Sequence, residues 1–298
     1  MPESIPHQEL PGDRPPAQRV LILATLAMVA FAGNSLLCRA ALKHSAIDAA
    51  SFTSIRIVSG ALVLWLIQRL RRMPPGLPRK RAGNWLSALA LFAYAACFSF
   101  AYNGLSAATG ALLLFGAVQA TMIGVGLHQG ERLRLQQVIG LAIALSGLAA
   151  LLLPGTTAPP AMAGTLMLGA GCAWGIYSLR GKGRTDPLAE TTGNFLRAAP
   201  MALLLSALAL PWAAVEQRGV WLAVVSGALT SGVGYAIWYA ALRGLNATRA
   251  ATIQLSVPVI AAAGGALLLD EPVSVRVVIA SATILGGIAL VIAKRKTA

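Results

Sequence analysis

The chain has 298 residues, of which 57% are hydrophobic and 11% charged, and its net charge is +14. A soluble domain usually carries about 25% charged residues, so a chain with a mean hydropathy of +0.70 is expected to be an integral membrane protein. The basic residues lie between apolar runs, which favours a role in membrane topology over binding of nucleic acid.

Apolar runs long enough to span a bilayer, about 20 residues each, follow one another with short links between them. None alternates polar and apolar residues as the strand of a membrane barrel would, so the predicted fold is an all-α polytopic membrane protein. The ten predicted transmembrane helices cover residues 18–38, 50–68, 84–103, 105–127, 135–153, 161–180, 189–210, 219–242, 246–269 and 276–293.

The polar segments at the two ends are predicted to be cytoplasmic tails, covering residues 1–17 and 294–298. If the N-terminus lies inside the cell, the inside links hold most of the arginines and lysines, and the outside links hold few. Positive charge is retained on the cytoplasmic side, so both termini are expected to be cytoplasmic.

The two halves of the chain, 18–153 and 161–293, match one another at an offset of about 140 residues. Matched pairs are Arg39 with Arg180, Arg56 with Arg197, Tyr94 with Tyr235 and Phe98 with Tyr239. Each half contributes five helices, and an odd number makes the second half enter the membrane from the opposite side. Two inverted five-helix repeats around a central cavity are typical of transporters.

Several motifs together carry a resemblance to a known family. They are the arginine early in the second helix of each half (Arg56 and Arg197) and the acidic turns Gly130-Glu131-Arg132 and Asp270-Glu271-Pro272, each followed by a Gly-containing helix. Over residues 18–293 the chain resembles the EamA-domain branch of the drug/metabolite transporter superfamily, and most of all the YddG-type exporters of aromatic and other amino acids. The first half departs from the family pattern, which prefers proline at the position of Arg132.

The resemblance implies efflux of small metabolites across a bacterial inner membrane, through a substrate cavity between the halves. It does not fix the substrate.

Aromatic residues lie in two stripes that the repeat brings together. Tyr94 and Phe98 share one helical face, as do Tyr235, Trp238 and Tyr239. A cavity lined by such rings suits an aromatic or large apolar side chain. It also suits an organic cation held by cation–π attraction. Packing between helices or against lipid is the alternative role for each ring.

The first helix of each half adds further candidates. Asn34 lies next to Phe31, and its repeat position is flanked by Trp174 and Tyr177. An amide in hydrocarbon needs a partner. We therefore expect Asn34 to bind either the substrate's amino or carboxylate group or a neighbouring helix.

Gln254 and Pro258 lie within the ninth predicted helix. Proline donates no backbone hydrogen bond, so it frees the carbonyl four residues earlier, which belongs to Gln254. A free carbonyl and a side-chain amide at one depth predict recognition of an ammonium group; the alternative is a packing kink.

Arg56 and Arg197 are basic residues well inside predicted helices. A charge there faces a cavity or a partner, and the candidate partners are Asp48, Glu190 or backbone carbonyls. We favour a gating or structural role for both arginines over substrate contact. Phe195 is expected to face lipid.

These observations predict an exporter of amino acids, particularly aromatic and other large or neutral ones, that works by alternating access. The alternatives are export of drugs, organic cations or other metabolites, and, with less support, a non-transporting scaffold or an intramembrane enzyme. We expect no catalytic residues, no metal site, no cofactor and no nucleic-acid partner. Membrane lipid is the expected surrounding partner, and transport requires no oligomer.

Overall fold

The computed structural model describes residues 16–71, 82–128, 130, 134–153, 158–181, 186–242, 245 and 253–292, and every regular element within these ranges is a helix. Glu131 and Arg132 of the first acidic turn, and residues 1–15 and 293–298 of the two predicted tails, lie outside this description. The elements are α1 (Ala17–His44), α2 (Ala49–Leu70), α3 (Trp85–Tyr102), α4 (Ala107–His128), α5 (Leu135–Leu152), α6 (Ala161–Gly181), α7 (Pro187–Leu208), η1 (Leu210–Trp212), α8 (Gln217–Val225), η2 (Ser226–Val233), α9 (Gly234–Leu242), α11 (Ser256–Leu268) and α12 (Val275–Ile292).

Seven helical stretches of the described chain are long and apolar enough to cross a membrane. They are α1 to α6 and the run Gln217–Leu242, which joins α8, η2 and α9. The outward side chains of the bundle are largely apolar, as at Leu62, Leu204 and Leu267, which are more than half exposed. Such a surface is stable against lipid and not against water.

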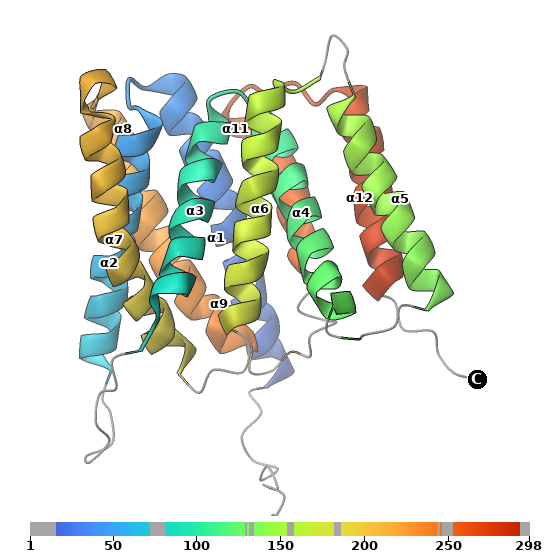
Figure 1. Cartoon of the computed structure of the whole chain (residues 1–298), viewed down its shortest axis with the longest axis horizontal. Helices are drawn as coiled ribbons and strands as arrows, with labels where there is room; N and C mark the ends of the chain where they lie inside the picture. The colour runs from blue at the N-terminus through green and yellow to red at the C-terminus, as the bar shows by residue number, and fades with distance from the viewer. Residues whose placement is uncertain are drawn as a thin grey trace, which may run out of the picture.

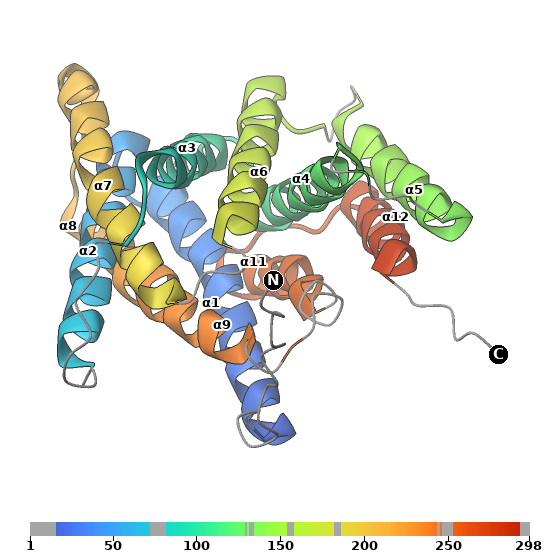
Figure 2. The same ribbon diagram turned by 60° about the horizontal axis from the view of Figure 1, so that its bottom comes forward.

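The helices stand side by side as a bundle (Figure 1). Helices α5 and α12 form a pair at one edge, and α2, α7 and α8 lie at the opposite edge, an order that the turned view in Figure 2 keeps. Glycines let the edge pair approach closely. A Cβ on Gly140 would lie 2.6 Å from the Gly287 carbonyl oxygen, and one on Gly147 would lie 2.9 Å from the Thr283 Cβ.

Glycines also allow helices α4 and α6 to approach each other closely. A Cβ on Gly171 would lie 2.5 Å from the Cβ of Ala117, and one on Gly175 would lie 3.0 Å from the Cβ of Thr121. The two glycines stand four residues apart, so they fall on one face of α6. This is the close helix packing expected of a small-residue motif.

The structure departs from two predicted helices. The run predicted over 219–242 contains the π-helical segment η2, which rotates the residues after it relative to a regular α-helix. In the helix predicted over 246–269, the turn at Leu255 separates Gln254 from α11. Pro258 therefore lies in the first turn of α11, where a missing N–H is tolerated, and not at a kink in mid-helix.

Candidate functional site

Five aromatic rings meet in the middle of the bundle. They come from four helices: Phe31 from α1, Tyr94 and Phe98 from α3, Trp174 from α6 and Tyr235 from α9. The Trp174 ring is central, with its centroid 4.8 Å from that of Tyr94 and 5.1 Å from that of Tyr235. Phe31 stands edge-on to Tyr235 at 5.8 Å. Sequence analysis predicted all five as cavity residues, and the structure brings them together.

These rings enclose a cavity of about 20 Å³. The remaining lining residues are Asn34, Ser35, Leu114, Phe115 and Thr230. A space of this size holds about one water molecule, whereas binding sites for small molecules usually measure about 300–1,000 Å³. The centre is therefore closed in this conformation, and a ligand would enter only after the helices part.

Asn34 fixes one polar side of the cavity and is itself buried. Its side-chain oxygen accepts hydrogen bonds from the Ser226 hydroxyl at 2.7 Å and from the Thr230 hydroxyl at 3.4 Å. Its amide nitrogen donates to the Tyr94 hydroxyl at 3.3 Å. Asn34 thus joins α1 to α3 and to the π-helical segment η2. The predicted bond to a neighbouring helix is present. The predicted contact with substrate stays a prediction, and Asn34 lines the cavity where such a contact would form.

Arg56 lies at the other side of Tyr94, and 2% of its surface is exposed. Its Nη2 donates to the Tyr94 hydroxyl at 3.0 Å and its Nε to the Ser231 hydroxyl at 3.2 Å. The guanidinium carbon stands 5.1 and 5.0 Å from the ring centroids of Tyr94 and Phe98. The predicted partner Asp48 lies elsewhere, since its carboxylate caps the start of α2.

Other predicted residues lie around this centre. Trp238 borders it through Phe31, at 5.9 Å between ring centroids. Tyr177 and Tyr239 line a smaller space with Glu190 and Asn194. Tyr177 also reaches the centre through Trp174 at 5.5 Å.

Two residues stand differently from what sequence analysis predicted. Gln254 is half-buried and is not part of the lining of the central cavity. Phe195 is 1% exposed and packs edge-on against Tyr235 at 5.8 Å, so the prediction that it faces lipid is wrong. Its ring also lies against α2, where a Cβ on Gly60 would lie 2.7 Å from the Phe195 Cε1.

The hydroxyl groups of η2 were missed by sequence analysis. Ser226, Thr230 and Ser231 all lie within the run Ser226–Val233 and all bond to Asn34 or Arg56. The available signal was their polarity and small size within an otherwise apolar predicted helix. Hydroxyls on a regular helix normally bond to their own backbone, which conceals a role in contacts to other helices.

Polar contacts close the bundle at both of its ends. At one end, Arg39 of α1 forms an ion pair with the buried Glu271 (Nε to Oε1, 2.7 Å), which also accepts a hydrogen bond from the backbone N–H of Ala107. At the other end, Arg180 of α6 donates to the side chains of Asn84 and Ser87 at 3.0 Å.

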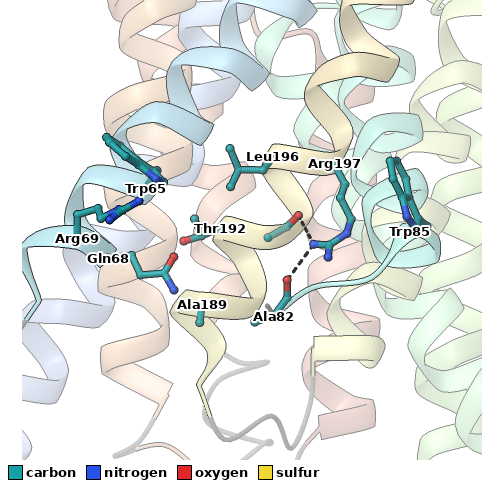
Figure 3. Close-up of a pocket in the computed structure, with 10 residues that line it drawn as sticks. Trp65, Gln68, Arg69, Ala82, Trp85, Ala189, Thr192, Leu196 and Arg197 are labelled. Carbon is teal, nitrogen blue, oxygen red and sulfur yellow. Dashed lines mark hydrogen bonds between the residues drawn. The ribbon is translucent and has the colours of Figure 1, made fainter. Parts of the chain in front are cut away.

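A larger cavity lies away from this centre. A crevice of about 460 Å³ runs between α2 and α7, with Trp65 and Arg69 on one wall and Leu196 on the other (Figure 3). Arg197 also lines this crevice and points toward Ala82 (Figure 3). Its Nη1 donates to the carbonyl oxygens of Ala82 and Gly193, both at 2.8 Å. Trp65 is 42% exposed, so the crevice opens on the outer surface of the bundle.

Comparison with known proteins gives consistent results. The model of the EamA-like transporter family matches twice, over residues 18–153 and 161–293. The chain is 55% identical over 280 residues to "Uncharacterized protein PA1977" of Pseudomonas aeruginosa, covering 94% of this chain and 96% of that protein. It is 23% identical over 249 residues to "Uncharacterized transporter YoaV" of Bacillus subtilis, covering 80% and 85%. A solved structure titled "Crystal structure of protein" shares the fold with a TM-score of 0.62 at 20% identity, covering 93% and 98%.

Proposed function

The chain belongs to the EamA-like transporter family, and on that premise we propose that it exports amino acids with aromatic or other large apolar side chains across a bacterial inner membrane. Membership of the family and the apolar helices make it a multi-pass membrane transporter. The amino-acid cargo, the outward direction and the inner-membrane location are parts of the proposal.

The proposed architecture has ten transmembrane helices in two inverted five-helix repeats, with both termini in the cytoplasm. The pattern of helix contacts supports it. Helix α2 packs on its repeat partner α7, α4 on α11, and α5 on α12. The contact between α1 and α9 is matched by that between their repeat partners, α6 and α3. Reciprocal contacts of this kind are what a two-fold relation between the halves produces.

The observation that carries the proposed cargo is the closed central cavity. Its rings present apolar faces, which favour an aromatic or large aliphatic side chain. Its polar edge, formed by Asn34, Tyr94 and Thr230, offers both hydrogen-bond donors and acceptors. A small cavity with a few convergent polar groups at the middle of a repeat interface is where carriers bind substrate.

Alternating access would proceed by opening one end of the bundle at a time. The Arg39–Glu271 ion pair and the hydrogen bonds of Arg180 occupy opposite ends, and both are formed in this conformation. In the proposed cycle, this conformation is the closed intermediate between the two open ones. Breaking one set of contacts while keeping the other would expose the cavity to one side only.

Flux into liposomes tests the proposal. Purified protein should pass labelled phenylalanine faster than empty vesicles, and Trp174→Ala should reduce that flux at least tenfold, because Trp174 is the central ring. Trp221→Ala is the matched control, since Trp221 is 62% exposed and is not among the residues that line the cavity. No flux of phenylalanine, methionine or threonine by the wild-type protein would overturn the amino-acid cargo. Equal losses in the two tryptophan variants would overturn the cavity.

A further inference from the structure

Within the described part of the chain, the buried guanidinium of Arg56 lacks one of the hydrogen bonds and the counterion that a buried cation normally has. Its Nη1 has no hydrogen-bond partner among the residues that the structure describes, although the side chain is buried. The groups that contact the guanidinium are neutral: two hydroxyls and two aromatic rings. An arginine stays charged at any physiological pH. A buried charge normally has a counterion or a metal, because desolvation without one is costly.

The acidic residues of the described chain are engaged elsewhere. Asp48 and Asp186 cap the starts of α2 and α7, and Glu271 is paired with Arg39. Glu216 and Glu190 accept hydrogen bonds from the backbone N–H groups of Ala46 and Gly83, near the ends of helices. The remaining carboxylate, Asp270, lies beyond the end of α11. The centre of the bundle therefore carries an uncompensated positive charge within the described residues.

Tyr94 connects this charge to the cavity. Its hydroxyl oxygen accepts hydrogen bonds from both Arg56 and Asn34. A phenolic hydroxyl also has one hydrogen to donate, and no described residue accepts it. Because Tyr94 lines the cavity, a ligand oxygen there would receive a hydrogen bond that Arg56 polarises. Oxygen atoms that bear negative charge form the strongest bonds of this type.

The same geometry disfavours a cationic cargo. The Arg56 guanidinium already lies over the faces of Tyr94 and Phe98, at about 5 Å from each centroid, so these two rings are not free to hold a second cation. A cation in the cavity would also be repelled by Arg56 across a medium of low dielectric constant. The aromatic lining alone would accept a cargo of either positive or negative charge.

We propose that the cargo is recognised as an anion: a small molecule with an aromatic or large apolar body whose carboxylate binds the Tyr94 hydroxyl and neutralises Arg56. This rests on the transport function proposed above and narrows it. The carboxylate is the required group, whereas an amino group is tolerated but not required. Arg56 thereby becomes a substrate-recognition residue, in contrast to the gating or structural role favoured by the sequence.

Three ligands with the same ring test the inference on purified wild-type protein: 3-phenyllactate, phenylalanine and phenethylamine, which are an anion, a zwitterion and a cation at pH 7. We expect unlabelled 3-phenyllactate to displace labelled 3-phenyllactate at least as well as phenylalanine does. Phenethylamine should be at least tenfold weaker than both. Displacement by phenethylamine as strong as that by 3-phenyllactate, or binding of none of the three, would overturn the inference.

Variants locate the charge. Arg56→Gln should weaken 3-phenyllactate binding at least tenfold and Arg56→Lys less than Arg56→Gln, while Arg197→Gln should stay within threefold of wild type. Unchanged affinity in Arg56→Gln would overturn the assignment of Arg56, and if that variant does not fold, the ligand series on the wild-type protein still decides the inference.

Flux measurements separate the anion requirement from the transport proposal. If phenethylamine passes as fast as phenylalanine, the transport proposal holds and the anion requirement is wrong. If 3-phenyllactate binds but none of the three ligands passes, the anion requirement holds and the transport proposal is wrong.

Discussion

Two arginines occupy equivalent positions in the two halves of the chain and have unlike surroundings. Arg56 is enclosed by rings and hydroxyls and keeps one nitrogen without a described partner. Arg197 donates from Nη1 to two backbone carbonyls, those of Ala82 and Gly193, and so joins the segment before α3 to α7 (Figure 3). A duplicated sequence position has thus become a candidate binding group in one half and a structural tie in the other.

The neighbouring pair of equivalent arginines, Arg39 and Arg180, also has unlike partners. Arg39 neutralises the buried carboxylate of Glu271, and the contacts of Arg180 include hydrogen bonds to the side chains of Asn84 and Ser87. An inverted repeat provides matching scaffolds, but substrate recognition at a single cavity needs only one copy of each polar group. Divergence between copies is therefore informative about which half holds the binding groups.

The largest expected effect comes from the packing around Arg56. A Cβ on Gly227 would overlap the Arg56 carbonyl oxygen and the Ser59 hydroxyl oxygen. Gly227 belongs to η2 and the two oxygens to α2, so relieving the overlap with the carbonyl requires one helix to move away from the other. We expect Gly227→Ala to cost more than about 3 kcal/mol of stability, at the upper end of overpacking effects. The measurement is the thermal midpoint and folded yield in detergent. Gly169→Ala is the control, because nothing lies within 4 Å of its added Cβ; equal behaviour of the two variants would contradict the close contact of α2 with η2.

The next effect concerns Glu271, whose side chain is 6% exposed. Glu271→Gln should lower stability by about 3 kcal/mol, because Arg39 would remain partly buried without its counterion. Asp186→Asn breaks the Arg71–Asp186 pair, in which both side chains are more than a third exposed, and should cost less than about 1 kcal/mol. Thermal midpoints of the two variants in the same detergent give the comparison. A larger loss in Asp186→Asn would show that the Arg39–Glu271 contact does not hold its end of the bundle closed.

The two equivalent arginines themselves should separate stability from binding. Arg197→Gln removes two charge-assisted hydrogen bonds to carbonyls and should lower stability by about 2 kcal/mol. Arg56→Gln removes a buried charge without a described counterion and should leave stability unchanged or raise it. Thermal midpoints without ligand test this opposition. A greater loss in Arg56→Gln than in Arg197→Gln would mean that Arg56 is a structural residue.

Sequence reasoning reached the aromatic rings and Asn34 but not the hydroxyl groups of η2. Tyr94, Phe98 and Tyr235 could be found because helical spacing and the repeat place rings on facing stripes. Phe31 and Trp174 could be found because they flank Asn34 and its repeat position. The bonds of Ser226 to Asn34 depend on the π-helical segment, whose register no periodicity argument contains.

Backbone carbonyls were among the predicted partners, and Arg197 has two of them, but the partners of Arg56 could not be derived from the sequence. A charge inside a helix indicates that it has a contact but does not say with which group, and Asp48 caps a helix instead of pairing with Arg56. Phe195 was misjudged because its burial depends on the packing of α2 and α9 against α7, which the sequence does not give. The number of transmembrane helices and the inverted relation of the halves stay predictions.

The smallest expected difference lies at the starts of the two helices that carry these arginines. Asp48 accepts hydrogen bonds from Ala50 and Ser51 at the start of α2 and from Ala214 in the following half, while Asp186 caps α7 through Ala189. Each aspartate replaced by alanine should cost about 1 kcal/mol as a lost helix cap. Asp48→Ala should cost slightly more, because it also releases the segment around Ala214.

The pH dependence of Asp48 gives the check. Burial by itself raises the pKa of Asp48, but the hydrogen bonds from Ser51, Ala214 and Ala50 outweigh it and hold the pKa below the ordinary value of 3.8. A carboxyl group with a lowered pKa in the folded state adds stability that is fully present above its unfolded pKa and is lost as the pH falls through the folded one. The stability difference between wild type and Asp48→Ala should therefore be constant from pH 8 to pH 5 and shrink below pH 3.8. A difference that shrinks already between pH 6 and pH 5 would show that the carboxylate does not hold these N–H groups.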